Sequence, residues 1–271
     1  VEGMTGTYNS LERDGVTVAM GGYSSNFVIN QDYAVRIPDN LPMEGVAPLL
    51  CAGITLYSPI KHWNTGPGKK VAVMGLGGLG HMGVKFAVAM GAEVTVLDTN
   101  ISRLRELDHH YAGRLRTIVS NTFEIERAVT DADLVIGSVL IPGAKAPKLV
   151  TNNHVKAMRP GSVLVDIAID QGGCFADSHA TTHAEPTYKV HDTVFYCVAN
   201  MPGAVPHTST YALTNATLPY AKALANKGWL AACKADTSLA LGLNTHEGKL
   251  VNQPVAEAHS LAHVSLEAVL A

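Results

Sequence analysis

The feature that most constrains this chain is the segment Val71-Ala-Val-Met-Gly-Leu-Gly-Gly-Leu-Gly80. Its first four residues are an apolar run of the kind that a buried parallel strand needs. Gly75, Gly77 and Gly80 follow in the spacing G-x-G-x-x-G. The first glycine permits a sharp turn, the second lets the backbone approach a pyrophosphate, and the third lets a helix pack close to the strand. The segment therefore predicts a dinucleotide-binding unit, with the phosphates at the helix N-terminus.

The residues after these glycines complete the same pattern. A helical segment covers residues 82–90, and a second apolar strand over 94–97 ends in Asp98, 23 residues after Gly75. An acid at this place hydrogen-bonds the adenosine ribose and disfavours a 2′-phosphate, so the predicted cofactor is NAD. The alternative is a glycine-rich turn followed by an ordinary strand-end aspartate. The complete order of strand, turn, helix, strand and acid favours the nucleotide fold.

Composition narrows the class of protein. Hydrophobic residues make up 47% of the 271 residues and charged residues 16%, which favours a sizeable core over disorder. The formal net charge of −3 gives no reason to expect nucleic acid or an anionic membrane as partner. The chain has no apolar run of about 20 residues, so we expect no membrane span. Its first residues lack the features of a signal peptide. We therefore expect a cytoplasmic protein whose partner is a small-molecule substrate.

The spacing of the cysteines and histidines does not form a dedicated metal-binding motif. Four cysteines are scattered through the chain without a Cys-x-x-Cys pair: Cys51, Cys174, Cys197 and Cys233. Without a secretory signal, this pattern favours reduced thiols. Of the 12 histidines, His179 and His183 have loose ligand spacing in a threonine-rich stretch. A metal site there remains an alternative to solvated histidines, but we expect no metal.

After Asp98 the sequence alternates between helical and strand-like segments. The expected helices cover 102–108, 123–129 and 150–158, and the expected strands cover 114–120, 133–140, 162–169 and 194–198. Such alternation predicts parallel strands joined by crossovers, with functional residues beyond the carboxyl ends of the strands. The predicted fold class is α/β: a doubly wound parallel Rossmann sheet with a short N-terminal β-rich segment and C-terminal helices.

Three parts are expected along the chain. Residues 1–65 hold the β-rich segment, over 1–44, and a connecting helix. Residues 66–206 form the NAD-binding Rossmann domain. Residues 207–271 form a helical segment, with alanine-rich helical sequence over 239–270.

Four motifs in the first 90 residues share one resemblance. They are Gly21-Gly-Tyr-Ser24, the apolar run 46–59, Gly66-Pro-Gly-Lys-Lys70 and the glycine motif continued to Gly83. Together they look like a zinc-dependent medium-chain alcohol dehydrogenase of the cinnamyl type, which makes residues 1–65 a remnant of its substrate domain. The family's zinc-binding cysteine matches Cys51, but its other ligands are absent, and one thiolate does not supply the three that a catalytic zinc needs. We therefore expect Cys51 to be a small buried apolar residue.

The rest of the chain, from about residue 90, resembles a second family. Its motifs are residues 140–150, residues 163–174 with Asp166-Ile-Ala-Ile-Asp-Gln171, residues 196–206 and residues 208–220. They look like the C-terminal part of bacterial alanine dehydrogenase. By this resemblance Asp98 holds the adenosine ribose, Arg103 and Ser120 lie near the adenine, and Asp170 is the catalytic residue beside the nicotinamide. The resemblance places four more residues on the nicotinamide side: Val139, Ile167, Asn200 and Met201.

Simpler interpretations of two of these residues stay open. Asp170 stands at the end of an apolar strand, before Gly172 and Gly173, where a functional acid is expected. It is alternatively a turn acid that caps the following segment. Asn200 is alternatively a turn-initiating residue before Met-Pro.

The two resemblances meet between about Gly83 and Asp98, which suggests a fusion or chimera. In alanine dehydrogenases the cationic residues that bind pyruvate come from the N-terminal domain, which is replaced here. Three functions therefore stay open: an NAD-dependent oxidoreductase of the alanine dehydrogenase type, a zinc-type alcohol dehydrogenase acting on primary alcohols or aldehydes, and a non-catalytic NAD-binding module. We favour the first because it covers most of the chain. The resemblance leaves a homo-oligomer open.

Overall fold

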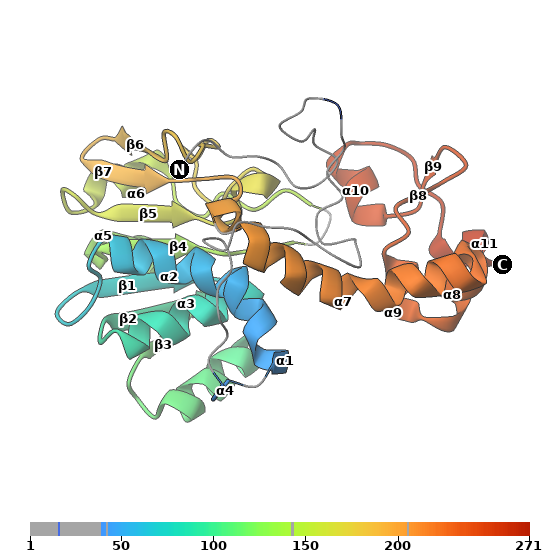
Figure 1. Ribbon diagram of the computed structural model, residues 1–271. Coiled ribbons are helices and arrows are strands. Elements are labelled where there is room, and N and C mark those ends of the chain that lie inside the picture. Colours follow the sequence, from blue (N-terminus) through green and yellow to red (C-terminus); the bar gives the residue numbers. More distant parts are fainter. Residues whose placement is uncertain (1–15, 17–38, 42, 142–143, 205) are drawn as a thin grey trace. The chain divides into compact units, whose positions relative to one another are not determined.

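The computed structural model describes residue 16 and residues 39–41, 43–141, 144–204 and 206–271. The expected β-rich segment over 1–44, including the motif at 21–24, lies almost entirely outside them. The chain divides into two compact units, drawn in Figure 1. The larger unit comprises residues 52–201 and 243–271, and the smaller comprises residues 202–242 with the described residues up to Cys51.

A seven-stranded sheet forms the centre of the larger unit. Its strands are β1 (Lys70–Met74), β2 (Glu93–Asp98), β3 (Arg116–Val119), β4 (Leu134–Gly137), β5 (Val163–Asp166), β6 (Thr187–Val190) and β7 (Thr193–Tyr196). They lie in the order β3-β2-β1-β4-β5-β7-β6, and every neighbouring pair except β6 and β7 is parallel. The strand order reverses between β1 and β4, so the ligand crevice of such a sheet lies beyond their carboxyl ends. The predicted α/β class with a doubly wound sheet is confirmed.

Strand β6 is an element that the sequence analysis did not predict. Two residues, His191 and Asp192, connect it to β7, and Val190 lies opposite Thr193 in the antiparallel pair. An antiparallel pair accepts a two-residue turn, whereas a parallel pair needs a long crossover. The sheet is therefore parallel throughout except at this edge.

Helices cover both faces of the sheet. They are α2 (Ala52–His62), α3 (Gly78–Ala89), α4 (Ile101–Tyr111), α5 (Thr122–Asp131) and α6 (Asn152–Ala157). Helices α2 and α3 pack together against one face, where Gly83 lies close to Leu56 and Ile136. Helices α5 and α6 contribute Val129 and Val155 to the core on the other face. Because strands β4 and β5 are buried on both faces, their sequences are apolar runs rather than alternating ones, except that β5 ends in Asp166.

The C-terminal residues contain less helix than expected. Strands β8 (Thr245–His246) and β9 (Lys249–Leu250) form a hairpin that interrupts the helix expected over 239–270. Its turn residues, Glu247 and Gly248, both have left-handed backbone, with φ of 47° and 75°. The short helices α10 (Gln253–Ala258) and α11 (Leu266–Leu270) follow.

The smaller unit is helical in its described part. It contains α1 (Met43–Val46), the 3-10 turn η2 (Ala47–Leu50), α7 (Pro206–Lys227), α8 (Trp229–Ala235) and α9 (Thr237–Leu241). Helix α7 packs against η2. Within the described ranges, none of the helices has both the length and the apolar character needed to cross a membrane.

Candidate functional site

The glycine-rich turn after β1 brings three elements into close contact. Gly75 has φ of +93°, and a Cβ added there would lie 2.9 Å from Val139, just beyond β4. A Cβ added at Gly80 would lie only 1.9 Å from the carbonyl oxygen of Gly75. The absence of side chains at these positions therefore lets α3 start directly on β1, next to the end of β4. Helix α3 begins at Gly78, earlier than the expected residue 82, because the turn itself needs few residues.

Gly77 has different surroundings from the other two glycines of the motif. Nothing lies within 4 Å of a Cβ added there. Gly77 is also the N-cap of α3, and no side chain caps the helix at this position. The first-turn amides of α3, which have no partner within the helix, are therefore left for a ligand. An anionic group is stabilised at such a helix start, and the open space at Gly77 fits a pyrophosphate.

Asp98 at the end of β2 ties the glycine turn to the neighbouring strand. Its carboxylate accepts hydrogen bonds from the backbone N–H of Leu76 at 2.6 Å and of Asn100 at 2.7 Å. Arg103 on α4 donates to the carbonyl oxygen of Leu76 at 3.2 Å. Ser120 follows β3, and its N–H donates to the carbonyl oxygen of Asp98 at 2.9 Å. The structure therefore brings the predicted ribose and adenine residues together around one turn.

The residues predicted for the nicotinamide side follow the carboxyl ends of β4, β5 and β7. Val139 follows β4, and the N–H of Ile167, just after β5, donates to the carbonyl oxygen of Gly137 at 2.9 Å. Asn200 and Met201 follow β7; Met201 is buried. His183 lies 2.7 Å from the backbone oxygen of Asn200 through its Nε2 atom.

Asp170 lies in the short 3-10 turn η3 (Ile169–Gln171), not at the end of a strand. Strand β5 ends at Asp166, earlier than the expected residue 169. The side chain of Asp170 is exposed, and among the described residues its carboxylate makes no hydrogen bond or ion pair. The carboxylate of Asp170 is therefore available to a ligand.

Asp166 is a buried acid of the site that sequence reasoning missed. Its carboxylate accepts hydrogen bonds from the backbone N–H groups of Cys174 at 2.8 Å, Phe175 at 3.3 Å and Ala168 at 3.2 Å, and from the hydroxyl of Ser178. Burial raises the pKa of Asp166, and the hydrogen bonds from Ser178 and from the N–H groups of Cys174 and Phe175 oppose this rise. The available signal was an acid at the end of a strand that is otherwise entirely apolar.

The turn after η3 depends on two adjacent glycines. Gly173 has φ of +78°, and a Cβ added there would lie 2.6 Å from the carboxylate of Asp166. Gly172 also has a left-handed φ, of +89°, but nothing lies within 4 Å of its added Cβ. We predict that Gly172→Ala lowers the free energy of unfolding by about 1 kcal/mol, the cost of left-handed backbone. Gly173→Ala adds the clash with a buried hydrogen-bonded group and is expected to cost at least about 2 kcal/mol.

Urea unfolding followed by circular dichroism measures this difference. The matched pair separates backbone strain from the contacts of the added Cβ with Asp166 and with the Cβ of Ser178, at 2.8 Å, since both glycines have left-handed backbone. Equal losses for the two variants would show that the space around Asp166 adjusts freely.

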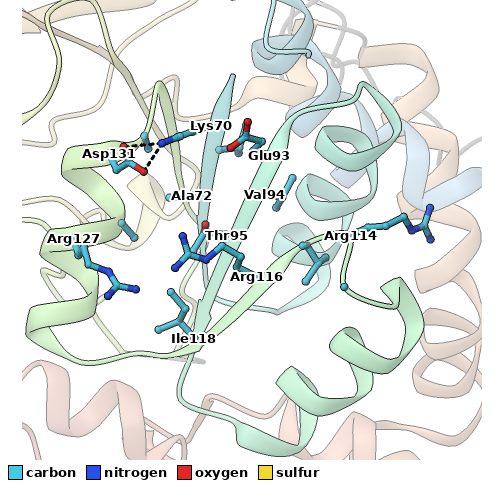
Figure 2. A pocket seen from close by; sticks show the side chains of 15 residues that line it. Lys70, Ala72, Glu93, Val94, Thr95, Arg114, Arg116, Ile118, Arg127 and Asp131 are labelled. Carbon is cyan, nitrogen blue, oxygen red and sulfur yellow. Dashed lines mark hydrogen bonds and ion pairs between the residues drawn. The ribbon is translucent and has the colours of Figure 1, made fainter. Parts of the chain in front are cut away.

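A cavity of about 240 Å³ lies at the amino ends of β1, β2 and β3, whereas the predicted site residues follow the carboxyl ends of the strands (Figure 2). Lys70, Glu93 and Arg116, the first residues of β1, β2 and β3, line it together with Arg127 and Asp131. Lys70 donates to the carboxylate of Asp131 at 2.8 Å and holds the pKa of that carboxyl below its usual value. None of the predicted site residues lines this cavity, so we do not assign it to the nucleotide site.

The expectation that Cys51 is buried is wrong. Cys51 is exposed because it lies at the break between η2 and α2 instead of inside one buried helix.

His179 stacks on Tyr188 with ring centroids 3.7 Å apart. Among the residues that the structure describes, no group of three or more histidine, cysteine or acidic side chains is placed to hold a metal.

The comparisons with known proteins identify one family over most of the chain. Residues 61–253 match the family described as "Alanine dehydrogenase/PNT, C-terminal domain". An alanine dehydrogenase of Mycolicibacterium smegmatis is 53% identical over 250 residues, which covers 89% of this chain and 67% of that protein. A solved L-alanine dehydrogenase is 41% identical with a TM-score of 0.65, and the match covers 81% of this chain and 66% of that one. The solved CAD of Helicobacter pylori, complexed with NADP(H), is 26% identical with a TM-score of 0.51 and coverage of 78% and 56%.

The chain is shorter than these relatives. It spans between 50% and 67% of the length of the first curated alanine dehydrogenases that it matches. The family match nevertheless takes in the whole sheet with its glycine turn, Asp98, Asp166 and Asp170. The chain therefore belongs to the alanine dehydrogenase/PNT C-terminal-domain family.

Proposed function

We propose that this chain binds NAD at the carboxyl edge of its sheet and acts as an alanine dehydrogenase. The reaction converts L-alanine, NAD⁺ and water reversibly into pyruvate, ammonium, NADH and a proton. The observation that carries the proposal is the open space at Gly77 beside the uncapped start of α3. It occurs at the point where the strand order reverses, and it lies next to a strand-end acid. Relatives named alanine dehydrogenase support the substrate.

Each predicted residue then has a role in holding the cofactor. The amides at the start of α3 bind the pyrophosphate, and Asp98 accepts hydrogen bonds from the adenosine ribose. A 2′-phosphate would meet the negative charge of Asp98, which favours NAD over NADP. Arg103 and Ser120 lie beside the adenine. The residues proposed to line the nicotinamide are Val139, Ile167, Asn200 and Met201. The chemistry that NAD supplies when bound is acceptance or donation of a hydride.

Asp170 is the proposed acid–base residue. Oxidation of an amine at a carbon atom requires a group that takes and returns a proton near that carbon. Asp170 is exposed at the carboxyl edge, and no described residue engages its carboxylate. The carboxylate of the substrate also requires a cationic partner.

One pair of measurements tests the function. NADH and NADPH are titrated into the purified chain, and NADH oxidation is followed with pyruvate and ammonium. We expect tighter binding of NADH than of NADPH, and oxidation that needs both substrates. Binding without oxidation would identify a non-catalytic NAD-binding module. Oxidation with an aldehyde in place of pyruvate and ammonium, lost on chelation of zinc, would identify the alcohol dehydrogenase alternative.

We also propose an alcohol-dehydrogenase-like origin for residues 1 to about 90, as their motifs suggest. The likeness to the solved CAD of H. pylori covers 78% of the chain and is not confined to this segment. The alignment with the M. smegmatis alanine dehydrogenase covers 89% of the chain and so takes in much of the same segment. Sequencing the source gene across the codons for residues 80–100 tests for a join.

The setting of the reaction is part of the proposal. We place it in the cytoplasm, and the buried thiols of Cys174, Cys197 and Cys233, which form no disulfide, are compatible with a reducing compartment. We further propose a homo-oligomer, which light scattering of the purified chain tests.

A further inference from the structure

The turn that follows Asp170 is held by hydrogen bonds on two sides. On its amide side, the buried carboxylate of Asp166 accepts from the N–H groups of Cys174 and Phe175. Gly173 makes this approach possible, since a Cβ there would lie 2.6 Å from that carboxylate. These two backbone N–H groups of the turn therefore point at the negative charge of Asp166.

On its carbonyl side, the turn lies along residues 146–150. The N–H of Ala146 donates to the carbonyl oxygen of Gln171 at 3.0 Å, and the N–H of Leu149 donates to that of Cys174 at 2.7 Å. The ammonium of Lys148 supplies two further bonds. It donates to the carbonyl oxygen of Gly172 and, at 2.9 Å, to that of Phe175.

The charges on the two sides match the groups that they face. A carboxylate faces N–H donors and an ammonium faces carbonyl acceptors, and such charge-assisted hydrogen bonds are stronger than neutral ones. The Lys148 ammonium also acts on Asp166 across the turn, where it lowers the pKa of the carboxyl against the effect of burial. A surface lysine whose ammonium only extends into solvent would not donate hydrogen bonds to two carbonyl oxygens of one turn.

We propose that Lys148 is a positioning residue that fixes the turn 171–176 and thereby sets the place of Asp170. Asp170 and Gln171 belong to η3, which leads directly into this turn, so a shift of the turn moves the Asp170 carboxylate. The catalytic consequence rests on the proposed function, whereas the conformational consequence does not. Because misplacement of a reacting group by about 1 Å can cost about 10²-fold in rate, loss of Lys148 would impair turnover without removing any group that touches the substrate.

Hydrogen exchange tests the conformational part without any need for activity. Lys148→Met keeps an unbranched, flexible side chain of nearly the same length and removes its charge and its hydrogen-bond donors. Lys156→Met on α6 is the matched control, because Lys156 is exposed and has no hydrogen bond or ion pair among the described residues. We expect amide exchange in a peptide covering 168–176 to be about tenfold or more faster in Lys148→Met than in the wild type or the control. Equal exchange in the three proteins would overturn the inference.

Kinetics separates positioning from a general loss of structure. In Lys148→Met we expect kcat with pyruvate and ammonium to fall about tenfold or more, while the Kd for NADH stays within about twofold. Lys148→Arg, which can donate to the same carbonyl groups, is expected to restore part of kcat. A kcat of Lys148→Met equal to that of the control would overturn the inference, as would an equal loss of NADH binding. If the wild type itself shows no turnover, the proposed function fails and the exchange measurement alone decides the role of Lys148.

Discussion

Gly80→Ala is expected to disrupt the folded nucleotide-binding unit. The added methyl group would lie 1.9 Å from the carbonyl oxygen of Gly75 and 2.7 Å from the hydroxyl of Ser138. Ser138 is buried, and its hydroxyl lies 2.9 Å from the carbonyl oxygens of both Met74 and Gly75, so it has no freedom to move away. We therefore expect the free energy of unfolding to fall by about 4 kcal/mol or more, which urea unfolding measures.

Gly77→Ala is the matched variant at the same turn. Nothing lies within 4 Å of its added methyl group, and its φ is −72°, so the fold is expected to remain stable within about 1 kcal/mol. The methyl group would occupy the space proposed for the pyrophosphate. Loss of hydrogen bonds to a charged group then weakens NADH binding by about tenfold or more. Unchanged NADH affinity in a folded Gly77→Ala protein would contradict the proposed location of the phosphates.

The nucleotide-binding half of the fold could be predicted because its determinants are close together in the sequence. The turn at Gly75, Gly77 and Gly80 and the acid at Asp98 occupy fixed places in one strand–helix–strand unit. The apolar runs of β4 and β5 are buried on both faces, so composition alone marks them as central strands. Local pattern and three-dimensional structure therefore agree here.

The remaining features depend on contacts that local patterns do not encode. Strand β6 has only half-buried and exposed residues, so no apolar run marks it. The carboxylate of Asp166 accepts from backbone N–H groups eight and nine residues later, and Lys148 bonds carbonyl groups 24 and 27 residues away. Such side-chain-to-backbone bonds arise from the tertiary fold. Asp170 lies in a 3-10 turn, whereas the sequence pattern placed it at the end of a strand.

Asp170→Asn is expected to abolish most of the turnover and leave the nucleotide site intact. The substitution keeps the size of the side chain and removes its ability to exchange a proton. Since a positioned acid–base group contributes about 10²- to 10⁴-fold, kcat with pyruvate and ammonium should fall within that range. Asp170 is exposed and makes no hydrogen bond or ion pair within the described part of the chain, so unfolding and NADH binding should change little.

The control for this variant is Asp192→Asn in the turn between β6 and β7, at the amino end of β7. Asp192 is exposed and carries the same charge, but it lies at the other end of the strand from the predicted site. A loss of kcat in Asp170→Asn alone, with NADH affinity equal in both variants, would separate a proton-transfer role from the effect of net charge. If both variants kept full turnover, the acid–base group would have to be another residue, and Asp170 would be the turn acid that its sequence context also allows.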